Sequence, residues 1–427
     1  MSARETGTFP SPGQSEMTLT IKQREAIFDR TCRTVQKNYF DPKFNGRDWL
    51  SLAGAKKEAI LKSKDAEEFE NLMHQLVREL GTSHTGFFHQ NLRRVPGRLA
   101  ISATFRKHQA PDGLRWMFQD VHEGGPAHAA GIEPVDVLVK INTQTIIPPE
   151  QPSFPMGAVS SLTVLKRDGR QVAVNITIPK PRWKKQPFAE PRTVSFAELD
   201  GHVAYLKTTI APGIVGVDIA REFDTAMTAL SNCDRLILDL RGFLGGGLGV
   251  LRLMSYMTPD KVPIGYSVTR RCAERGYRKE NLRRFERLPS SKFAIPLLAL
   301  QYLGRDESVV LVSEGLGPRK FHGRIVLLVN EHTASAGEIV CAFAAENKLA
   351  HIVGNRTAGR LLGGKGFRVG NGYLVILPAA AFLTWQGTSF EGQGIKPDIL
   401  VDWSPEAFRE GKDNQLEEAL GIAKALP

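Results

Sequence analysis

The spacing of apolar residues changes twice along the chain, and each change predicts a different kind of structure. Between residues 20 and 80, apolar side chains recur every three or four positions, as at Phe69, Leu72 and Leu76, which predicts amphipathic helices. Between residues 96 and 181, short alternating runs are separated by turn sequences such as PDG and RDG, which is typical of β-strands. From residue 193 onward, continuous apolar runs such as RLILDL alternate with helical segments, as in an α/β layer.

These patterns predict an α/β protein of several domains. With 427 residues the chain is long enough for about two to four domains. We expect a disordered tail at 1–18, a helical region at 19–92, a β-rich module at 93–182 and an α/β core at 183–427. A segment rich in Pro and Lys, residues 179–192, is the predicted linker before the core.

Charge adds one open question. The net charge is +11, and much of the basic excess lies in Thr269–Arg287. This segment is consistent with a solvated surface or with a surface that attracts anionic substrate, lipid or nucleic acid. Because no nucleic-acid-binding motif accompanies it, we expect no nucleic-acid partner.

Other features of the sequence bear on cofactors and on the cellular compartment of the protein. The cysteines are far apart and lack metal-ligand spacing, and no H-E-x-x-H string occurs, so we expect no metal and no cofactor. No window reaches 18 apolar residues, which predicts no integral membrane segment. The N-terminus lacks the apolar stretch of a secretory signal. As written, the chain is expected in the cytoplasm; a leader removed before Met1 would indicate a periplasmic or secreted protein.

A string of small residues, TASAG, joins the apolar run IVLLVN to a predicted helix and contains Ser335. Small residues at a strand-to-helix corner allow a sharp turn that exposes one side chain. A serine at such a corner is an N-cap or a nucleophile, and a nucleophile needs a neighbouring base.

A second corner is the glycine cluster in LILDLRGFLGGG, Leu236–Gly247. Glycines at the end of a buried strand let the backbone approach a ligand closely and leave N–H groups available. A tight turn without function is the alternative, and no G-K-[ST] follows to indicate a phosphate loop.

Within the β-rich module, GGPAHAAGIEPVDVLVKINTQTI resembles the PDZ-domain core of bacterial proteases. The resemblance implies that a sheet edge pairs with an extended peptide. It also implies that the segment Gly97, Arg98, Leu99 and Ala100 holds the carboxylate of a peptide C-terminus. A PDZ-like fold kept only as a spacer is the alternative.

Six segments in order resemble the carboxyl-terminal processing (tail-specific) serine peptidases and the related tricorn core protease: LGTSHTG, the PDZ-like string, LILDLRG-x-x-GGG, VNEHTASAGEI, IVGNRTAGR and FEGQGIKPDI. The resemblance implies a core of the ββα-spiral, crotonase-like type. It implies that Ser335 is the nucleophile and that the N–H groups of Ala336 and of Gly245 or Gly246 form the oxyanion hole.

The base distinguishes two branches of this family. The tail-specific branch uses a lysine where this chain has Arg360, and arginine keeps its proton. Lys365 could replace that lysine only if the loop were re-threaded. The tricorn-like branch uses a histidine with a serine beside it and a distant glutamate, and the matching positions hold His84, Ser83 and Glu391. The resemblance to this branch implies that His84 takes the Ser335 proton, while Ser83 and Glu391 orient the imidazole.

The sequence therefore predicts a serine endopeptidase that cleaves peptides or unfolded protein tails through an acyl-enzyme. Its expected partners are peptide or unfolded protein substrates, held at the C-terminus by the PDZ-like module. A catalytically silent peptide- or ligand-binding protein on the same fold stays open because Arg360 replaces the family lysine. An unrelated crotonase-type enzyme acting on coenzyme A thioesters is a further alternative, although the PDZ-like string argues against it.

Overall fold

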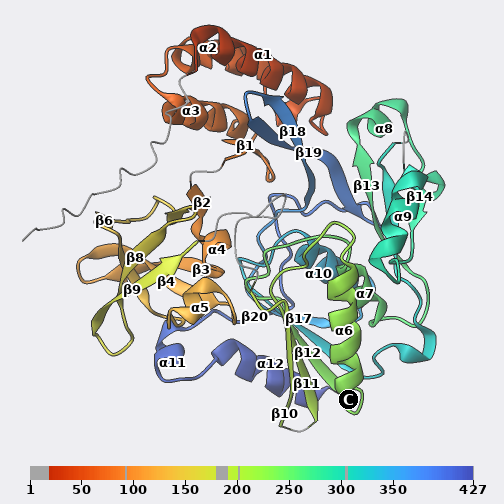
Figure 1. The fold of residues 1–427 in the computed structure, drawn as a ribbon. Helices are drawn as coiled ribbons and strands as arrows, with labels where there is room; N and C mark the ends of the chain where they lie inside the picture. Colours follow the sequence, from red (N-terminus) through yellow and green to blue (C-terminus); the bar gives the residue numbers. More distant parts are fainter. Residues whose placement is uncertain (1–18, 92–93, 179–190, 201, 303–305, 427) are drawn as a thin grey trace, which may run out of the picture. The chain divides into compact units, whose positions relative to one another are not determined.

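The computed structural model forms two compact units, each built from segments that are distant in the sequence (Figure 1). The structure describes residues 19–91, 94–178, 191–200, 202–302 and 306–426. Unit 1 comprises Met1–Gly81, Thr85–Asn91 and Lys365–Leu377, and unit 2 comprises Thr82–His84, Leu92–Gly364 and Pro378–Pro427. The predicted tail at 1–18 and most of the predicted linker at 179–192 lie outside the described residues. The predicted domain boundaries stay a prediction.

Unit 1 contains the helices that the early periodicity predicted. They are α1 (Ile21–Asn38), α2 (Trp49–Leu61) and α3 (Ala66–Arg78). The pair Asp65 and Glu68 resembles a capping box, and Asp65 does cap α3, since its side chain accepts from the Glu68 N–H. The return bond differs from that of a capping box, because the Glu68 side chain accepts from the N–H of Lys64, one residue before the cap. The strand β1 (Gly86–His89) pairs antiparallel with Tyr373–Ile376 of β19 (Tyr373–Thr384). These elements share one apolar core, in which the Phe87 and Tyr373 rings stack at 5.1 Å.

In unit 2, the predicted β-rich module is an antiparallel sheet ordered β3-β4-β5-β8-β9. Its strands are β3 (Ala103–Ala110), β4 (Gly113–Val121), β5 (Val137–Ile141), β8 (Val159–Leu165) and β9 (Gln171–Thr177), with β6 (Gln144–Thr145) beside β5. The pair β2 (Arg94–Pro96) and β7 (Ser153–Pro155) adds a second, small sheet. Within the PDZ-like string, PAHAAGI favours a short helix, and Pro126–Ala129 forms the helix α5.

One local prediction in this module was wrong. The alternating run LAISATF (Leu99–Phe105) favours a strand, but Gly97–Ala100 forms the single-turn helix α4, and β3 begins only at Ala103. The turn fits closely against its surroundings: a Cβ at Gly97 would lie 2.9 Å from the Phe105 ring and from the Pro152 carbonyl oxygen. Tertiary packing therefore overrides the alternation in the sequence.

The α/β core of unit 2 is a sheet ordered β10-β11-β12-β16-β17-β20. Its strands are β10 (Val194–Leu199), β11 (Val203–Thr208), β12 (Arg235–Asp239), β16 (Arg324–Val329), β17 (His351–Gly354) and β20 (Ile399–Leu400). The strands from β11 to β20 are parallel, and β10 is antiparallel to β11. The predicted alternation of buried strands and helices is confirmed: the helix α6 (Val217–Ala229) lies between β11 and β12 in the sequence.

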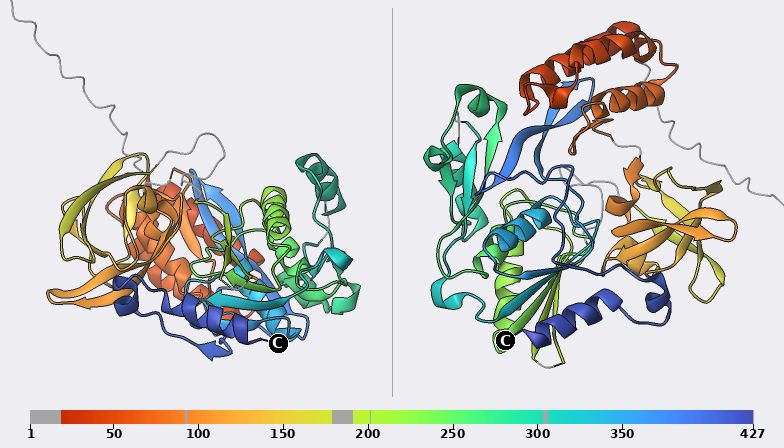
Figure 2. Two further views of the ribbon diagram at one scale, coloured as in Figure 1. Left: turned by 90° about the horizontal axis from the view of Figure 1, so that it is seen from below. Right: turned by 180° about the vertical axis from the view of Figure 1, so that it is seen from behind.

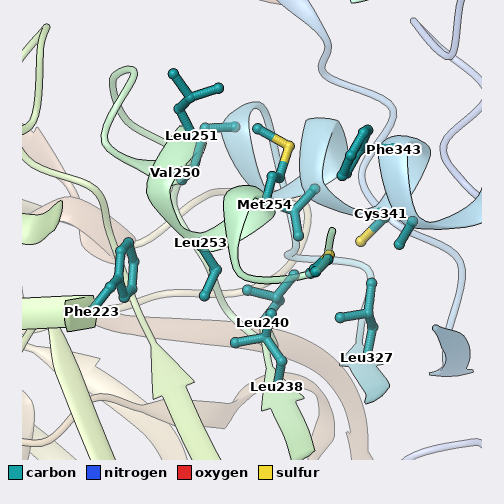
Figure 3. Close-up of a cluster of buried hydrophobic side chains, with 14 of the residues drawn as sticks. Phe223, Leu238, Leu240, Val250, Leu251, Leu253, Met254, Leu327, Cys341 and Phe343 are labelled. Carbon is teal, nitrogen blue, oxygen red and sulfur yellow. The ribbon is translucent and has the colours of Figure 1, made fainter. Parts of the chain in front are cut away.

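Both faces of this sheet are covered, which explains why its central strands are apolar without alternation. On one face Leu238, Leu240 and Leu327 pack against α6, α7 (Val250–Ser255) and α10 (Ala336–Glu346), as Figure 3 shows for part of the cluster. On the other face Ile237 packs with Val326 and with α12 (Asn414–Ala425), the dark blue helix beside the C-terminal mark in Figure 2. The parallel strands place the loops after β12 and β16 at one edge of the sheet.

The remaining elements of unit 2 lie outside these sheets. They include β13 (Pro263–Thr269), β14 (Arg283–Phe285), β15 (Val309–Val312), α8 (Arg270–Arg275), α9 (Ile295–Tyr302) and α11 (Pro405–Arg409). The strand β18 (Leu362–Gly370) begins in unit 2, and Ala380–Thr384 of β19 pair with β13. The basic segment Thr269–Arg287 contains α8 and β14. Among the described residues, none of the helices combines the length and the apolar character that crossing a bilayer requires.

Candidate active site

Ser335 occupies a strained turn between the buried strand β16 and the helix α10. Its backbone has φ 55° and ψ −117°, a conformation that non-glycine residues rarely adopt. Strained backbone at a strand-to-helix turn is how a nucleophile elbow exposes a serine hydroxyl. An ordinary N-cap residue has extended backbone, so the geometry favours the nucleophile over the simple cap.

The turn is held by a buried carboxylate that the sequence analysis did not single out. Glu338, in the first turn of α10, accepts from the Ser335 N–H at 3.2 Å and from the Arg360 N–H at 2.7 Å. Its other oxygen accepts from Thr357 Oγ1 at 2.6 Å and from the Gly359 N–H at 2.7 Å. The S-x-x-E spacing of a capping box was the available signal for this residue.

The glycine loop after β12 lies against the serine. A Cβ at Gly245 would come within 2.9 Å of the Ser335 Cβ and 3.4 Å of its Oγ, so only glycine fits there. Gly246 approaches the Ala211 backbone so closely that a Cβ would lie 2.0 Å from the Ala211 carbonyl oxygen. Within the described part of the chain, no acceptor takes the N–H of Gly245, Gly246 or Ala336. These three residues line the cavity that Ser335 faces, so their N–H groups are available to a ligand.

His84 belongs to a hydrogen-bonded relay that reaches far along the sequence. Ser83 Oγ lies 2.8 Å from His84 Nδ1 and donates to Glu391 Oε2 at 3.0 Å. The Ser83 N–H donates to Glu391 Oε1 at 2.7 Å, and the Leu361 N–H donates to Oε2 at 2.8 Å. Because the Ser83 proton goes to the carboxylate, the Ser83 oxygen accepts from His84 Nδ1–H. This tautomer leaves the His84 Nε2 lone pair free to accept a proton.

The electrostatic surroundings keep His84 neutral. Burial lowers the pKa of the imidazole from 6.5, and the positive charges of Arg360 and Arg98 lower it further, while Glu391 opposes them. Arg98 itself is half-buried, and burial together with Arg360 lowers its pKa to about 10. A neutral imidazole is the form that a general base requires.

Ser335 and His84 line the same cavity of about 1150 Å³. Its walls are mainly apolar, with Leu251, Met254 and Phe382 among the lining residues. No hydrogen bond joins His84 to Ser335 in the described residues. Catalytic hydrogen bonds are often long in ligand-free enzymes and shorten when substrate binds.

The other predicted site residues lie as follows. The segment Gly97, Arg98, Leu99 and Ala100 forms α4, and Leu99 lines the cavity. Arg360 stands where the tail-specific branch has lysine. The residue is exposed, and its backbone N–H donates to the Glu338 carboxylate. Lys365 belongs to unit 1 and is not among the residues that line the cavity. In the described residues, no group of three or more His, Cys, Asp or Glu side chains is arranged to hold a metal ion.

A family model for Peptidase family S41 matches residues 202–401, the segment that carries the glycine loop, Ser335 and Glu391. This segment belongs to peptidase family S41. The resemblance inferred from the motifs is therefore confirmed.

Two relatives extend the likeness beyond the S41 segment. The chain is 24% identical over 426 residues to the putative tricorn protease homolog 2 of Streptomyces coelicolor, covering 93% of this chain and 32% of that protein. It is 23% identical to the carboxyl-terminal-processing protease of Synechocystis sp., covering 96% of this chain and 89% of that protein. The chain thus spans about a third of the length of the Streptomyces relative.

Solved structures agree on the fold. The photosystem II D1 C-terminal processing protease matches with a TM-score of 0.56 at 18% identity, covering 94% of this chain and 97% of that one. Mature CPAF complexed with lactacystin matches with a TM-score of 0.59 at 14% identity, covering 95% and 98%. The predicted mixed α/β, multi-domain fold class is confirmed.

Proposed function

We propose that the chain is a serine endopeptidase that cleaves peptides or unfolded protein tails, with Ser335 as nucleophile and His84 as base. The observation that carries the proposal is the relay from Glu391 through Ser83 to His84, which ends at the cavity that Ser335 faces. Membership of the S41 segment in a peptidase family supports the same reaction class.

The chemistry follows from these positions. Ser335 Oγ attacks the scissile carbonyl carbon while its proton passes to His84 Nε2. The carbonyl oxygen becomes negative and accepts from the N–H of Ala336 and from Gly245 or Gly246. The C–N bond then breaks as His84 returns the proton to the leaving amine. Water repeats the sequence on the acyl-enzyme, which releases the acid and regenerates the serine.

A lysine base does not fit the described site. The position that the tail-specific branch fills with lysine holds Arg360, whose guanidinium keeps its proton at working pH. We therefore assign proton transfer to the imidazole of a Ser-His-Ser-Glu tetrad rather than to a Ser-Lys dyad.

The PDZ-like module would hold the substrate C-terminus at the same cavity. Leu99 of α4 lines the cavity, and the adjacent Arg98 has no acidic partner among the described residues. Burial and then the positive charge of Arg360 lower the pKa of Arg98, which places the two guanidinium groups near each other, so an anion between them would be favourable. The carboxylate of a peptide C-terminus is such an anion.

A fluorophosphonate probe tests whether the site is an enzyme or a silent binding site. We expect the probe to label the parent at Ser335, as assigned by peptide mass spectrometry, and to label His84→Ala far more slowly. A binding protein on the same fold would react no faster than Ser335→Ala.

Substrate anchoring has its own test. For the parent, amidation of a peptide's C-terminus should raise KM, whereas Arg98→Ala should bind the free acid and the amide equally. Arg94→Ala is the matched control, because Arg94 in the same module bonds to Ser153 instead. Equal KM values for acid and amide with the parent would remove the C-terminal anchor from the proposal.

A further inference from the structure

The glycine loop that supplies the oxyanion donors is held at its start by the PDZ-like module. Gly242, the first glycine after β12, has φ +70°, and a Cβ there would lie 2.7 Å from the His122 ring and 3.0 Å from the Asp120 side chain. Its carbonyl oxygen bonds to His122 Nε2 at 3.1 Å. Its N–H donates to Asn330 Oδ1 at 3.0 Å. Both polar groups of Gly242 are therefore fixed.

Asp120, at the end of β4, is the centre of this arrangement. The Asn330 amide nitrogen donates to its two oxygens at 3.2 and 3.0 Å. Thr104 Oγ1, from the neighbouring strand β3, donates to Asp120 Oδ2 at 2.5 Å. Asp120 is 9% exposed, and Asn330 and His122 are 1% exposed each. Both Asp120 oxygens and the Asn330 amide nitrogen are hydrogen-bonded, whereas His122 Nδ1 has no partner among the described residues. Buried groups that are hydrogen-bonded contribute to local order.

The same Asn330 side chain reaches the nucleophile turn. Its Oδ1 accepts the His332 N–H at 3.1 Å, three residues before Ser335. The Asn330 N–H donates to Thr333 Oγ1, which in turn donates to the Leu240 carbonyl oxygen. The Ala334 N–H donates to the Phe243 carbonyl oxygen at 3.1 Å. The glycine loop and the nucleophile turn are thus fastened to each other and, through Asn330, to Asp120.

We propose that Asp120 is a positioning residue of the catalytic site: through Asn330 it sets the distance between the Gly245–Gly246 donors and Ser335. The inference rests on the proposed peptidase function. It makes the PDZ-like module an integral part of the oxyanion hole rather than a spacer. Displacement of β4 would therefore move the N–H groups of Gly245 and Gly246. Because oxyanion donors stabilise the transition state more than they strengthen substrate binding, such a movement would lower kcat more than it changes KM.

A swap of the two side chains gives the sharpest experiment. Asp120→Asn replaces one acceptor oxygen with an amide nitrogen opposite the donors of Thr104 and Asn330. Asn330→Asp places two carboxylates against each other. In the double variant Asp120→Asn with Asn330→Asp, the amide at position 120 donates to the carboxylate at position 330, so a donor again faces an acceptor. The carboxylate at position 330 can still accept from the N–H groups of Gly242 and His332. We expect each single variant to lower kcat by about tenfold to a hundredfold with KM within about twofold, and the double variant to recover most of kcat.

A matched control separates positioning from stability. Asp136 is a fully buried carboxylate in the same module, paired to Lys166 at 2.6 Å. Asp136→Asn should lower the melting temperature without changing kcat. A peptide aldehyde, which forms a tetrahedral adduct with Ser335, should lose affinity in parallel with kcat in the Asp120 and Asn330 variants only. Should a single variant fail to fold, His122→Leu removes the bond to the Gly242 carbonyl and carries the same expectation.

The outcomes distinguish this inference from the function on which it rests. If the parent shows no turnover above Ser335→Ala, the proposed peptidase function has failed. If the parent turns substrate over and the folded Asp120, Asn330 and His122 variants keep its kcat, the function stands and the positioning role is wrong.

Discussion

The Oγ of Ser83 lies 3.0 Å from Oε2 of Glu391, a residue 308 positions later in the chain. The direction of that hydrogen bond decides which nitrogen of His84 carries the proton. A carboxylate can only accept, so the Ser83 hydroxyl donates to it and accepts from the imidazole. In the tetrad that we propose, the arrangement corresponds to a triad with one serine inserted between the acid and the histidine.

Glu391→Gln should therefore lower kcat strongly while leaving substrate binding nearly unchanged. The glutamine amide can donate to Ser83, which then turns its hydroxyl proton toward His84 Nδ1. The resulting tautomer carries its proton on Nε2 and cannot accept one from Ser335. We expect kcat to fall by about 10²- to 10⁴-fold with little change in KM. Steady-state kinetics at one pH measure this, and a kcat within threefold of the parent would show that Glu391 does not set the tautomer.

The pH dependence of kcat/KM should reflect the positive charges of the two arginines near His84. Burial and the charges of Arg360 and Arg98 lower the pKa of His84 below 6.5. Protonated imidazole cannot act as the base, so kcat/KM should stay high to below pH 6.5 and then fall. Arg360→Met removes a positive charge, which makes protonation easier, so the acidic limb should move to higher pH. Arg360→Lys keeps the charge and should keep the limb; an unmoved limb in Arg360→Met would contradict the assignment of that limb to His84.

Gly245→Ala should affect catalysis more than stability. The added methyl group would lie 2.9 Å from the Ser335 Cβ, so either the serine or the loop must shift. Loss of an oxyanion donor costs about a hundredfold to a thousandfold in kcat. Gly131→Ala is the control, since Gly131 also has a positive φ (+73°) but nothing within 4 Å of its added Cβ. A parental kcat in the Gly245 variant would exclude that loop from the oxyanion hole.

Glu338→Gln should weaken both the fold and the nucleophile turn. The carboxylate accepts four hydrogen bonds and is fully buried, whereas a glutamine offers one acceptor and turns its amide toward the remaining donors. Leaving buried donors unsatisfied costs about 1–3 kcal/mol each, so we expect a lower melting temperature together with a lower kcat. Glu346→Gln, at the far end of α10, is the control and should change neither.

The sequence predicted the elements more completely than their contacts. Periodicity located the helices of unit 1 and the buried strands of the core, because each depends on a local pattern of burial. It placed a strand where α4 forms, because a one-turn helix leaves too few residues to show a period. The relay partners Ser83 and Glu391 came from a family resemblance, not from spacing.

The residues that sequence analysis missed are those that act through long-range contacts. Asp120 and Asn330 are 210 positions apart, and neither lies in a string whose chemistry requires a carboxylate or an amide there. Their role becomes visible only when folding brings β4 next to the loop after β16. Glu338 did carry a local signal, since a serine followed three residues later by glutamate is typical of a helix start.

The most direct test of the central claim is casein or peptide turnover by four proteins: the parent, Ser335→Ala, His84→Ala and Arg360→Ala. We predict that the first two substitutions lower turnover by several orders of magnitude and that Arg360→Ala leaves it within about tenfold of the parent. Normal turnover by His84→Ala, together with an inactive Arg360→Ala, would contradict the account of a histidine base acting on Ser335.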